Sequence, residues 1–190
     1  MRYLILLLIG AIACAAVAVG CGNPLGLPGA YITNRTDTIS LYALSGTPVY
    51  LPSGYSIATR SAVRTEQSIP FDFAFDIDSI GEAVLYPTGA LKLGTQSGLQ
   101  ISAQDFDSLL IAPTTSYKQD TALVVTNNSV VVAHSGTVTC SFGILAYYYA
   151  KLHVLAIDTT TGPNGRRIDF EILTDVNCGY RGLNSGLPSQ

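Results

Sequence analysis

The stretch FDFAFDID, residues 71–78, has the clearest two-residue alternation in the chain. In an extended strand, its large apolar side chains would share one face, and a mostly acidic set would share the other. The first set is Phe71, Phe73, Phe75 and Ile77, and the second is Asp72, Ala74, Asp76 and Asp78. One buried and one solvated face is the pattern of an antiparallel sheet. The stretch therefore predicts an all-β fold.

Short runs rich in Val, Ile, Tyr and Thr flank this stretch, separated by Gly, Pro and Asn, as is typical of strands joined by turns. The expected strands are 30–34, 38–44, 55–64, 71–78, 82–86, 121–126, 129–134, 138–142, 144–158 and 167–174, with 49–51 as an edge strand or extended loop. Such spacing predicts an antiparallel β-sandwich of about eight to ten strands, with a barrel as the second choice.

Three local signals refine this order. Arg35-Thr36-Asp37 is expected to turn between the first two strands, and Asn127-Asn128 is a tight hairpin signal. Ser102, with Asp105 three residues later, predicts one short helical turn that runs through Leu110. The run 144–158 is long enough for a helix, but the turn-rich residues after it and the return run 167–174 favour a hairpin of strands.

The first 21 residues, MRYLILLLIGAIACAAVAVGC, have a different composition from the rest of the chain. Arg2 precedes an apolar run that ends at Val19, and Gly20 then precedes Cys21. This order of a basic start, an apolar core and small residues predicts a helical export signal.

The end of this segment resembles the lipobox of bacterial lipoproteins, because a small residue directly precedes Cys21. The resemblance implies that Cys21 becomes the lipidated N-terminus. It also implies a cell-envelope location facing the periplasm or the exterior. Gly22 carries no signal for retention in the inner membrane, so the outer membrane is favoured if the organism has one.

Three other outcomes remain open for the N-terminus. Cys14 is a competing acceptor, although cleavage there would leave an apolar stub on the mature protein. About eighteen apolar residues are also just enough for an uncleaved membrane span. Ordinary cleavage near Ala16 or Ala18 would release a soluble product. The expected division is a signal peptide (1–20), a Gly/Pro-rich tether (21–29), a β-sandwich domain (30–182) and a polar tail (183–190).

Two cysteines, Cys140 and Cys178, lie within the expected domain. An exported domain with an even cysteine pair favours a disulfide. The hairpin made by 144–158 and 167–174 would bring both cysteines to the same end of the sheet. Two buried free thiols are the alternative, and a metal site is not expected because the pair lacks the close spacing and histidine partners of zinc ligands.

The composition argues against several functions. The net charge of −3, with charged residues at 12%, disfavours nucleic-acid binding. Only His134 and His153 could act as bases near neutral pH, and there is no nucleophile elbow, so the protein is expected not to be an enzyme. No cofactor or metal is expected.

An acidic cluster supports the alternative of a hydrolase, perhaps with Ca²⁺. Seven of the thirteen acids lie between Glu66 and Asp107. Neighbouring acids on one strand face are roughly 6–7 Å apart, which is too far to hold one ion without loop oxygens. We therefore expect Asp72, Asp76 and Asp78 to be at least partly exposed and distant from both histidines.

Tyr147, Tyr148 and Tyr149 form the best candidate contact surface, for a protein or a glycan. Strand alternation would place Tyr148 on one face and its two neighbours on the other. Packing in the core is the alternative for these rings. The sequence thus predicts a lipid-anchored, non-enzymatic envelope protein with a structural or binding role, and a self-assembling surface subunit is a further alternative.

Overall fold

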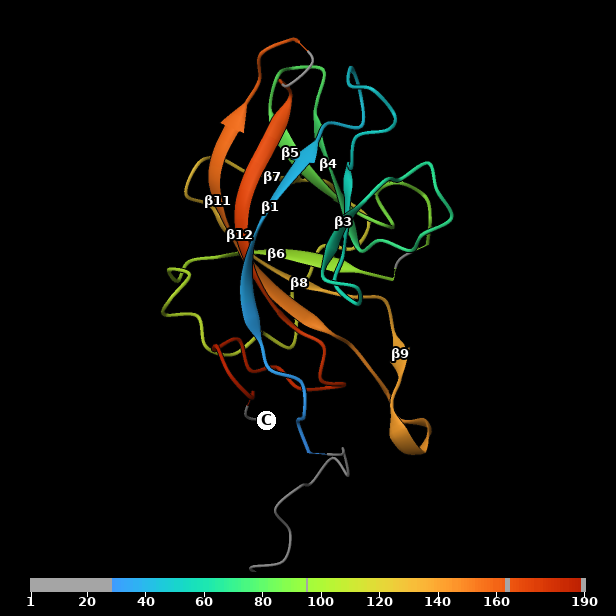
Figure 1. Ribbon diagram of the computed structural model, residues 1–190, viewed down its shortest axis with the longest axis vertical. Helices are drawn as coiled ribbons and strands as arrows, with labels where there is room; N and C mark the ends of the chain where they lie inside the picture. The colour runs from blue at the N-terminus through green and yellow to red at the C-terminus, as the bar shows by residue number, and fades with distance from the viewer. Residues whose placement is uncertain (1–28, 95, 163–164, 189–190) are drawn as a thin grey trace, which may run out of the picture.

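The computed structural model describes residues 29–94, 96–162 and 165–188 (Figure 1). The predicted export signal, Cys21 and most of the predicted tether lie outside the described residues. Within them, no helix is long and apolar enough to cross a membrane.

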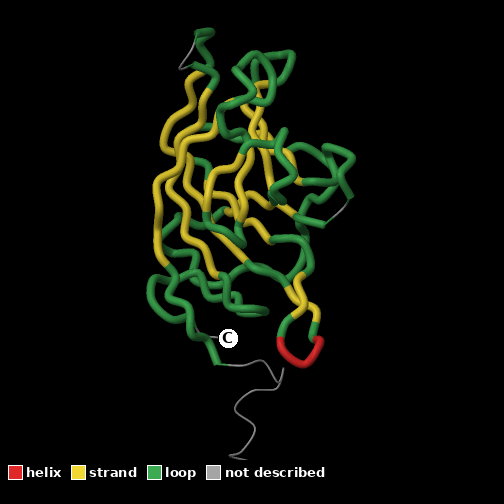
Figure 2. Tube along the Cα trace, turned by 45° about the vertical axis from the view of Figure 1, so that its right-hand side comes forward, coloured by secondary structure: helices red, strands yellow, loops and turns green. Residues whose placement is uncertain are grey.

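Two five-stranded antiparallel sheets pack face to face as a sandwich (Figures 1 and 2). Sheet one has the order β1 (Arg35–Tyr42), β12 (Arg167–Asp175), β11 (Tyr149–Asp158), β8 (Val130–His134), β6 (Gly98–Ser102). Sheet two has the order β3 (Ser61–Val63), β2 (Gly54–Ser56), β4 (Phe73–Ile77), β5 (Ala83–Pro87), β7 (Leu123–Val124). A separate ribbon pairs β9 (Val138–Thr139) with β10 (Leu145–Ala146) around a 3₁₀ turn, η1 (Ser141–Gly143). The predicted sandwich is confirmed, and the barrel was the wrong alternative.

The alternating stretch forms β4 in the middle of sheet two, and its apolar face enters the core between the sheets. Phe73 and Phe75 are fully buried, and Ile77 is almost so. The Phe73 ring stacks on Tyr55, with centroids 5.4 Å apart, and lies 6.2 Å from Phe170 of sheet one. Truncating a buried aromatic ring of this kind costs about 3–5 kcal/mol of stability, so this face holds the two sheets together.

The Asn127-Asn128 turn is present but does not make a hairpin, so that prediction was wrong. Asn128 has φ 66°, and the Ser129 amide donates to the Thr126 carbonyl at 3.0 Å. β7 pairs with β5 in sheet two, whereas β8 pairs with β6 and β11 in sheet one. Every residue of β8 is buried, and both of its edges are taken by these neighbours, which leaves no edge for β7.

Several predicted strand boundaries were also wrong. Arg35-Thr36-Asp37 does not turn, because every residue of β1, from Arg35 to Tyr42, pairs with a residue of β12. The expected strand 55–64 is two short strands, β2 and β3, joined by a turn in which Arg60 has φ 53°. The expected long strand 144–158 is divided into β10 and β11, and residues 49–51 lie in a turn.

The predicted helix near Ser102 was wrong as well. Ser102 ends β6, a strand that the sequence analysis did not predict. What remains of the helix is a single turn, in which the amides of Ser108 and Leu109 both donate to the Asp105 carbonyl at 3.1 Å. The segment 103–119 instead covers the outer face of sheet one, where it builds a second apolar cluster. This cluster contains Leu109, Ala112, Val130, Val132, Tyr149, Leu173 and Leu183.

Lys151 of β11 fastens this covering segment to the sheet. Its side chain is buried, and Nζ donates to the carbonyl of Leu109 at 3.0 Å and to the carbonyl of Phe106. The ammonium also lies 4.4 Å from the centre of the Phe106 ring. Burial lowers the pKa of Lys151, so the two carbonyls and the ring replace the water that this cation has lost.

Candidate ligand-binding site

The three consecutive tyrosines are distributed over two cavities, as strand alternation predicts. Tyr147 and Tyr149 line a cavity on the outer face of sheet one. Tyr148 lines a different cavity beside the disulfide, and it also packs against the main core. The sequence alone could not show which of the two sides would be hollow.

The first cavity, which we call the aromatic pocket, has a volume of about 220 Å³. The His134 ring is part of its lining, and its centroid is 4.6 Å from those of both Tyr117 and Tyr147. Tyr149 lies 6.4 Å from Tyr147 in a perpendicular orientation. Polar side chains complete the lining, namely Thr114, Thr115, Ser116 and Gln119.

Neighbouring strands and the covering segment place these rings. His134 ends β8 and Tyr149 begins β11, and the two residues are opposite each other in the antiparallel register. Tyr117 comes from the covering segment, which is held to the sheet by the isolated bridge between Leu99 and Lys118. The two amides of this bridge donate to the opposite carbonyls at 2.8 and 2.9 Å. The floor of the pocket is therefore regular sheet, and one wall is the covering segment.

Gly98 of β6 provides the space that the histidine ring occupies. A Cβ added at Gly98 would lie 2.4 Å from Nε2 of His134 and 2.8 Å from Cβ of Tyr117. Both distances are too short for any side chain to fit without movement of these residues. A glycine inside a strand often marks such a close approach, and here it allows the pocket to form.

The electrostatics of the pocket favour a neutral histidine. Nδ1 of His134 lies 2.8 Å from the carbonyl oxygen of Ser135. A carbonyl only accepts, so Nδ1 carries the proton and Nε2 is left as the acceptor nitrogen. Burial lowers the pKa of His134. The ring is thus fixed by a backbone carbonyl and not by a carboxylate.

Tyr117 and Tyr149 of the pocket are neutral too. The Tyr117 hydroxyl donates to the Pro113 carbonyl at 3.0 Å. Burial raises the pKa of Tyr117 and of Tyr149, and the nearby positive charge of Arg181 opposes both shifts. No Asp or Glu lines the cavity among the described residues. The site thus offers aromatic faces and neutral polar groups, and the positive charge of Arg181 acts on Tyr117 and Tyr149.

Asp72 corrects an expectation from the sequence, because it is buried and only 9% exposed. Its Oδ2 accepts from the Ile57 amide at 2.7 Å, and its Oδ1 accepts from the Gly136 amide at 3.1 Å. Burial raises the pKa of Asp72. The carboxylate connects the start of β4 to two separate loops, and this bridging draws it inside even though its position in the alternation is on the polar face.

Asp76 and Asp78 are partly exposed, as expected, and each organises its own turn. Oδ1 of Asp76 accepts from the hydroxyl of Ser45 at 2.7 Å and lies 3.7 Å from the Arg166 guanidinium. Oδ1 of Asp78 accepts from the amides of Ile80 and Glu82, both at 2.9 Å. The three acids of this stretch therefore serve three different groups of backbone and side-chain donors.

No group of three or more His, Cys, Asp or Glu side chains in the described part of the chain could hold a metal ion. His153 pairs with Glu171 of the adjacent strand, with Nδ1 2.8 Å from Oε1. This pair is partly exposed and does not line the aromatic pocket.

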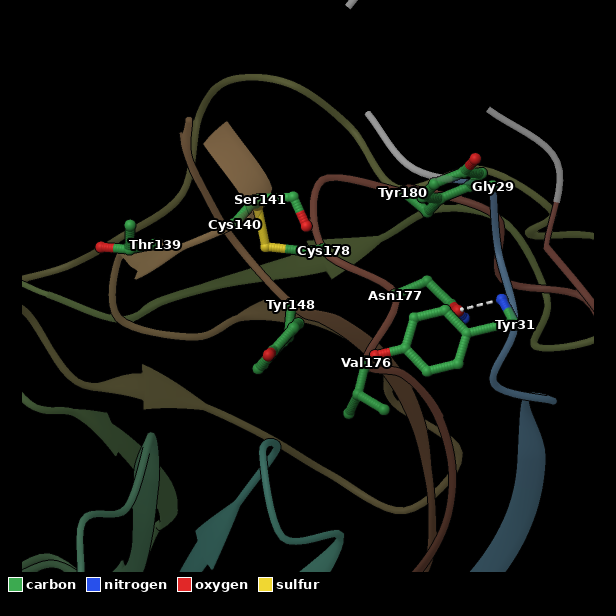
Figure 3. A pocket seen from close by; sticks show the side chains of 10 residues that line it. All are labelled: Gly29, Tyr31, Thr139, Cys140, Ser141, Tyr148, Val176, Asn177, Cys178 and Tyr180. Atoms are coloured by element: carbon green, nitrogen blue, oxygen red, sulfur yellow. Dashed lines mark hydrogen bonds between the residues drawn. A yellow bond between two sulfur atoms is a disulfide. The ribbon is translucent and has the colours of Figure 1, made fainter. Parts of the chain in front are cut away.

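The predicted Cys140–Cys178 disulfide is confirmed, with Cα atoms 5.8 Å apart. It joins the tip end of β9 to the segment after β12, and it lines a cavity of about 200 Å³ together with Gly29, Tyr31 and Tyr148 (Figure 3). The β11–β12 hairpin brings the two cysteines together in the way that the sequence indicates.

Asn177, beside this disulfide, fastens the start of the described chain to the domain. Its Oδ1 accepts from the amides of Tyr31 at 3.0 Å and Ile32 at 2.9 Å, and its Nδ2 donates to the Ile32 carbonyl at 2.7 Å. Asp175 is fully buried next to it, and Oδ1 accepts from the backbone and side-chain amides of Asn177 at 2.8 and 2.9 Å. Burial raises the pKa of Asp175 to about 6.

Comparison with known protein families finds no matching family model, and comparison with curated proteins finds no significant match. The geometry of the site therefore carries the functional argument. The sequence analysis did not identify Tyr117 and Gly98 as residues of the site, and it did not place His134 in the pocket. The one available signal was Gly98, a glycine beside the alternating residues Leu99 and Ile101.

Proposed function

We propose that the protein is a lipid-anchored, non-enzymatic component of a bacterial cell envelope that binds a neutral saccharide in the aromatic pocket. The observation that carries this proposal is the arrangement of Tyr117, Tyr147 and Tyr149 around a neutral His134. The lipobox-like sequence that ends at Cys21 supports the anchor and the location. The outer membrane is favoured, with the domain facing the periplasm or the exterior.

The lining of the pocket matches the chemistry of a sugar ring. Aromatic faces can cover the apolar C–H side of a pyranose, while hydroxyl and amide groups exchange hydrogen bonds with its hydroxyls. Gln119 and Thr114 supply such groups. A cage for a quaternary ammonium would also be aromatic, but the positive field of Arg181 at Tyr117 and Tyr149 disfavours a cation.

A non-enzymatic role is supported by the separation of the potential catalytic groups. His134 is held by a backbone carbonyl, His153 pairs with Glu171, and Asp72 is engaged by two backbone amides. General acid–base catalysis needs two such groups to converge on one substrate. Among the described residues, these partners leave no pair of such groups shown to face one substrate, as the hydrolase alternative would need.

The anchor is tested by metabolic labelling of the full chain with palmitate. We expect label in the wild-type protein and its complete loss in Cys21→Ala, with Cys14→Ala as the matched control that keeps the label. Label that survives in Cys21→Ala, or that depends on Cys14, would overturn the anchor.

The binding function is tested by saturation-transfer NMR of the full chain with glucose, galactose, mannose, N-acetylglucosamine and their disaccharides. We expect transfer to at least one sugar, strongest at the C–H protons of one face, because that face would contact the rings. Absence of transfer to every member of the panel would overturn saccharide binding and leave the anchor untouched.

A further inference from the structure

The β9–β10 ribbon projects from the sandwich (Figure 2). Its tip exposes apolar side chains. The tip consists of residues 141–145. Phe142 is 91% exposed and Leu145 is 67% exposed. Both side chains belong to one projecting turn, and a contiguous apolar surface of this kind is a candidate contact site.

The ribbon is also free of charge over an extended length. From Ser135 to Ala150 the chain contains no Asp, Glu, Lys or Arg. Tyr31, Tyr148 and Tyr180 line the cavity beside the Cys140–Cys178 disulfide. Apolar residues at a tip with tyrosines behind them are the distribution that proteins show at a bilayer interface, where tyrosine lies at the level of the head groups.

The backbone holds the tip in a defined shape. Phe142 has φ 61° and ψ 19°, a left-handed conformation that is rare for a bulky residue. The Cys140–Cys178 disulfide fixes the residue directly before the tip to the segment that follows β12. Local strain of this kind persists where the surrounding structure enforces it, and it is concentrated at functional positions. The Phe142 ring is thus held outward instead of folding back onto the ribbon.

The chain enters the domain beside this ribbon. Gly29, the first described residue, lines the same cavity as Thr139 and Cys140 (Figure 3). Eight residue steps separate Gly29 from Cys21, which is at most about 28 Å of extended chain. A lipid on Cys21 therefore keeps this end of the domain close to the bilayer.

The opposite end of the sandwich lies farther away. Asp158, at the other end of the β11–β12 hairpin, is nine strand residues beyond Tyr149, or about 30 Å, and it pairs with Arg167. Arg166 next to them donates to the carbonyl of Ile77, which places the β4–β5 turn at that far end.

We propose that the tip of the β9–β10 ribbon inserts into the membrane interface when the protein is anchored. The lipid bilayer is the occupant of this apolar tip, with Phe142 and Leu145 among the acyl chains and Tyr31, which is 78% exposed, at the head groups. The inference rests on the proposed lipid anchor and adds a second membrane contact to it. The domain would then be held in one orientation on the membrane.

The absence of tryptophan from the chain allows a direct test. Phe142→Trp and Leu145→Trp each place a single fluorophore at the tip. Ile80→Trp is the matched control, because Ile80 is 78% exposed in the β4–β5 turn at the far end. Each full-length lipidated variant is reconstituted into vesicles of phosphatidylethanolamine and phosphatidylglycerol, with and without lipids brominated near the head of the acyl chain.

We expect the emission of both tip variants to shift to the blue and to be quenched by the brominated lipids, while the Ile80→Trp variant shows neither change. Because the ribbon is uncharged, high salt should leave the quenching unchanged. Flotation of the vesicles separates the possible failures. If the protein does not float with the vesicles, the anchor fails and this inference fails with it.

If the protein floats with the vesicles but the tip emission matches that of Ile80→Trp, the inference alone is overturned. A blue shift without quenching by brominated lipids would mean that a protein surface, such as a second copy of the chain, covers the tip. That result would also overturn membrane insertion. If one of the two tip variants does not fold, the other still tests the proposal, since Phe142→Trp and Leu145→Trp report on the same contact.

Discussion

Removal of the Cys140–Cys178 disulfide should lower the stability of the domain by about 4 kcal/mol. The two cysteines are 38 positions apart in the chain, and closing a loop of this length restricts the unfolded chain by about that free energy at 25 °C in the chain-entropy model. For a domain of this size, each kcal/mol corresponds to about 2–4 °C in Tm. The expected fall in Tm is therefore about 8–16 °C.

Urea unfolding of the double variant Cys140→Ser, Cys178→Ser, followed by circular dichroism, measures this loss. The dependence of the unfolding free energy on urea should also become steeper, because the unfolded chain without the cross-link exposes more surface. Ser141→Ala is the matched control, since it alters the adjacent exposed residue and leaves the disulfide intact.

Equal midpoints for the wild type and the double variant would refute this reasoning. A loss of stability without any change in the urea dependence of the unfolding free energy would refute the chain-entropy explanation in particular. It would indicate that native contacts around the disulfide supply the stabilisation.

Three further predictions concern single positions. Lys151→Met should destabilise the domain by about 2–4 kcal/mol, because two buried carbonyls lose their donor; urea unfolding unchanged from wild type would contradict this. Because the pKa of Asp175 is raised to about 6, the stability it contributes is full below about pH 4 and is lost as the pH rises through 6. Unfolding from pH 4 to 7 should show this fall in the wild type relative to Asp175→Asn, and parallel curves would count against it. Gly98→Ala should cost about 1–3 kcal/mol, and Gly136→Ala less, because its Cβ would lie 3.1 Å from Oε1 and 3.4 Å from Cβ of Gln96, both longer than the contacts at Gly98; equal losses would argue against the crowded floor of the pocket.

The sandwich itself was predictable because two-residue alternation directly reflects burial of one strand face. Phe73, Phe75 and Ile77 enter the core as their spacing indicates. The disulfide was predictable for a similar reason, since the β11–β12 hairpin is local in sequence and brings Cys140 and Cys178 to one end.

Pairing between distant strands was not predictable from local signals. The Asn127-Asn128 turn is correct as a turn, but the partners of β7 and β8 depend on which sheet edges remain free. Local patterns carry no information about that choice. β6 was missed because its Ser102 also fits a helix cap, and the tertiary pairing with β8 overrides that preference.

The candidate site was predictable only in part. Alternation correctly separates Tyr148 from Tyr147 and Tyr149. The pocket also needs Tyr117, which comes from a covering segment without regular structure, and no periodicity marks such a segment. Asp72 was misplaced for the same reason, because the loop amides that draw it inside are distant in sequence.

The central claim is that the aromatic pocket binds a neutral saccharide, and the most direct measurement compares two adjacent tyrosines. Isothermal titration of the full chain, with the sugar that gives the strongest NMR transfer, should show affinity about tenfold or more weaker in Tyr147→Ala, as expected for an aromatic anchor. Tyr148→Ala is the matched control, because Tyr148 belongs to the other cavity, and it should bind like the wild type. Equal affinities in both variants, or a loss confined to Tyr148→Ala, would contradict the claim.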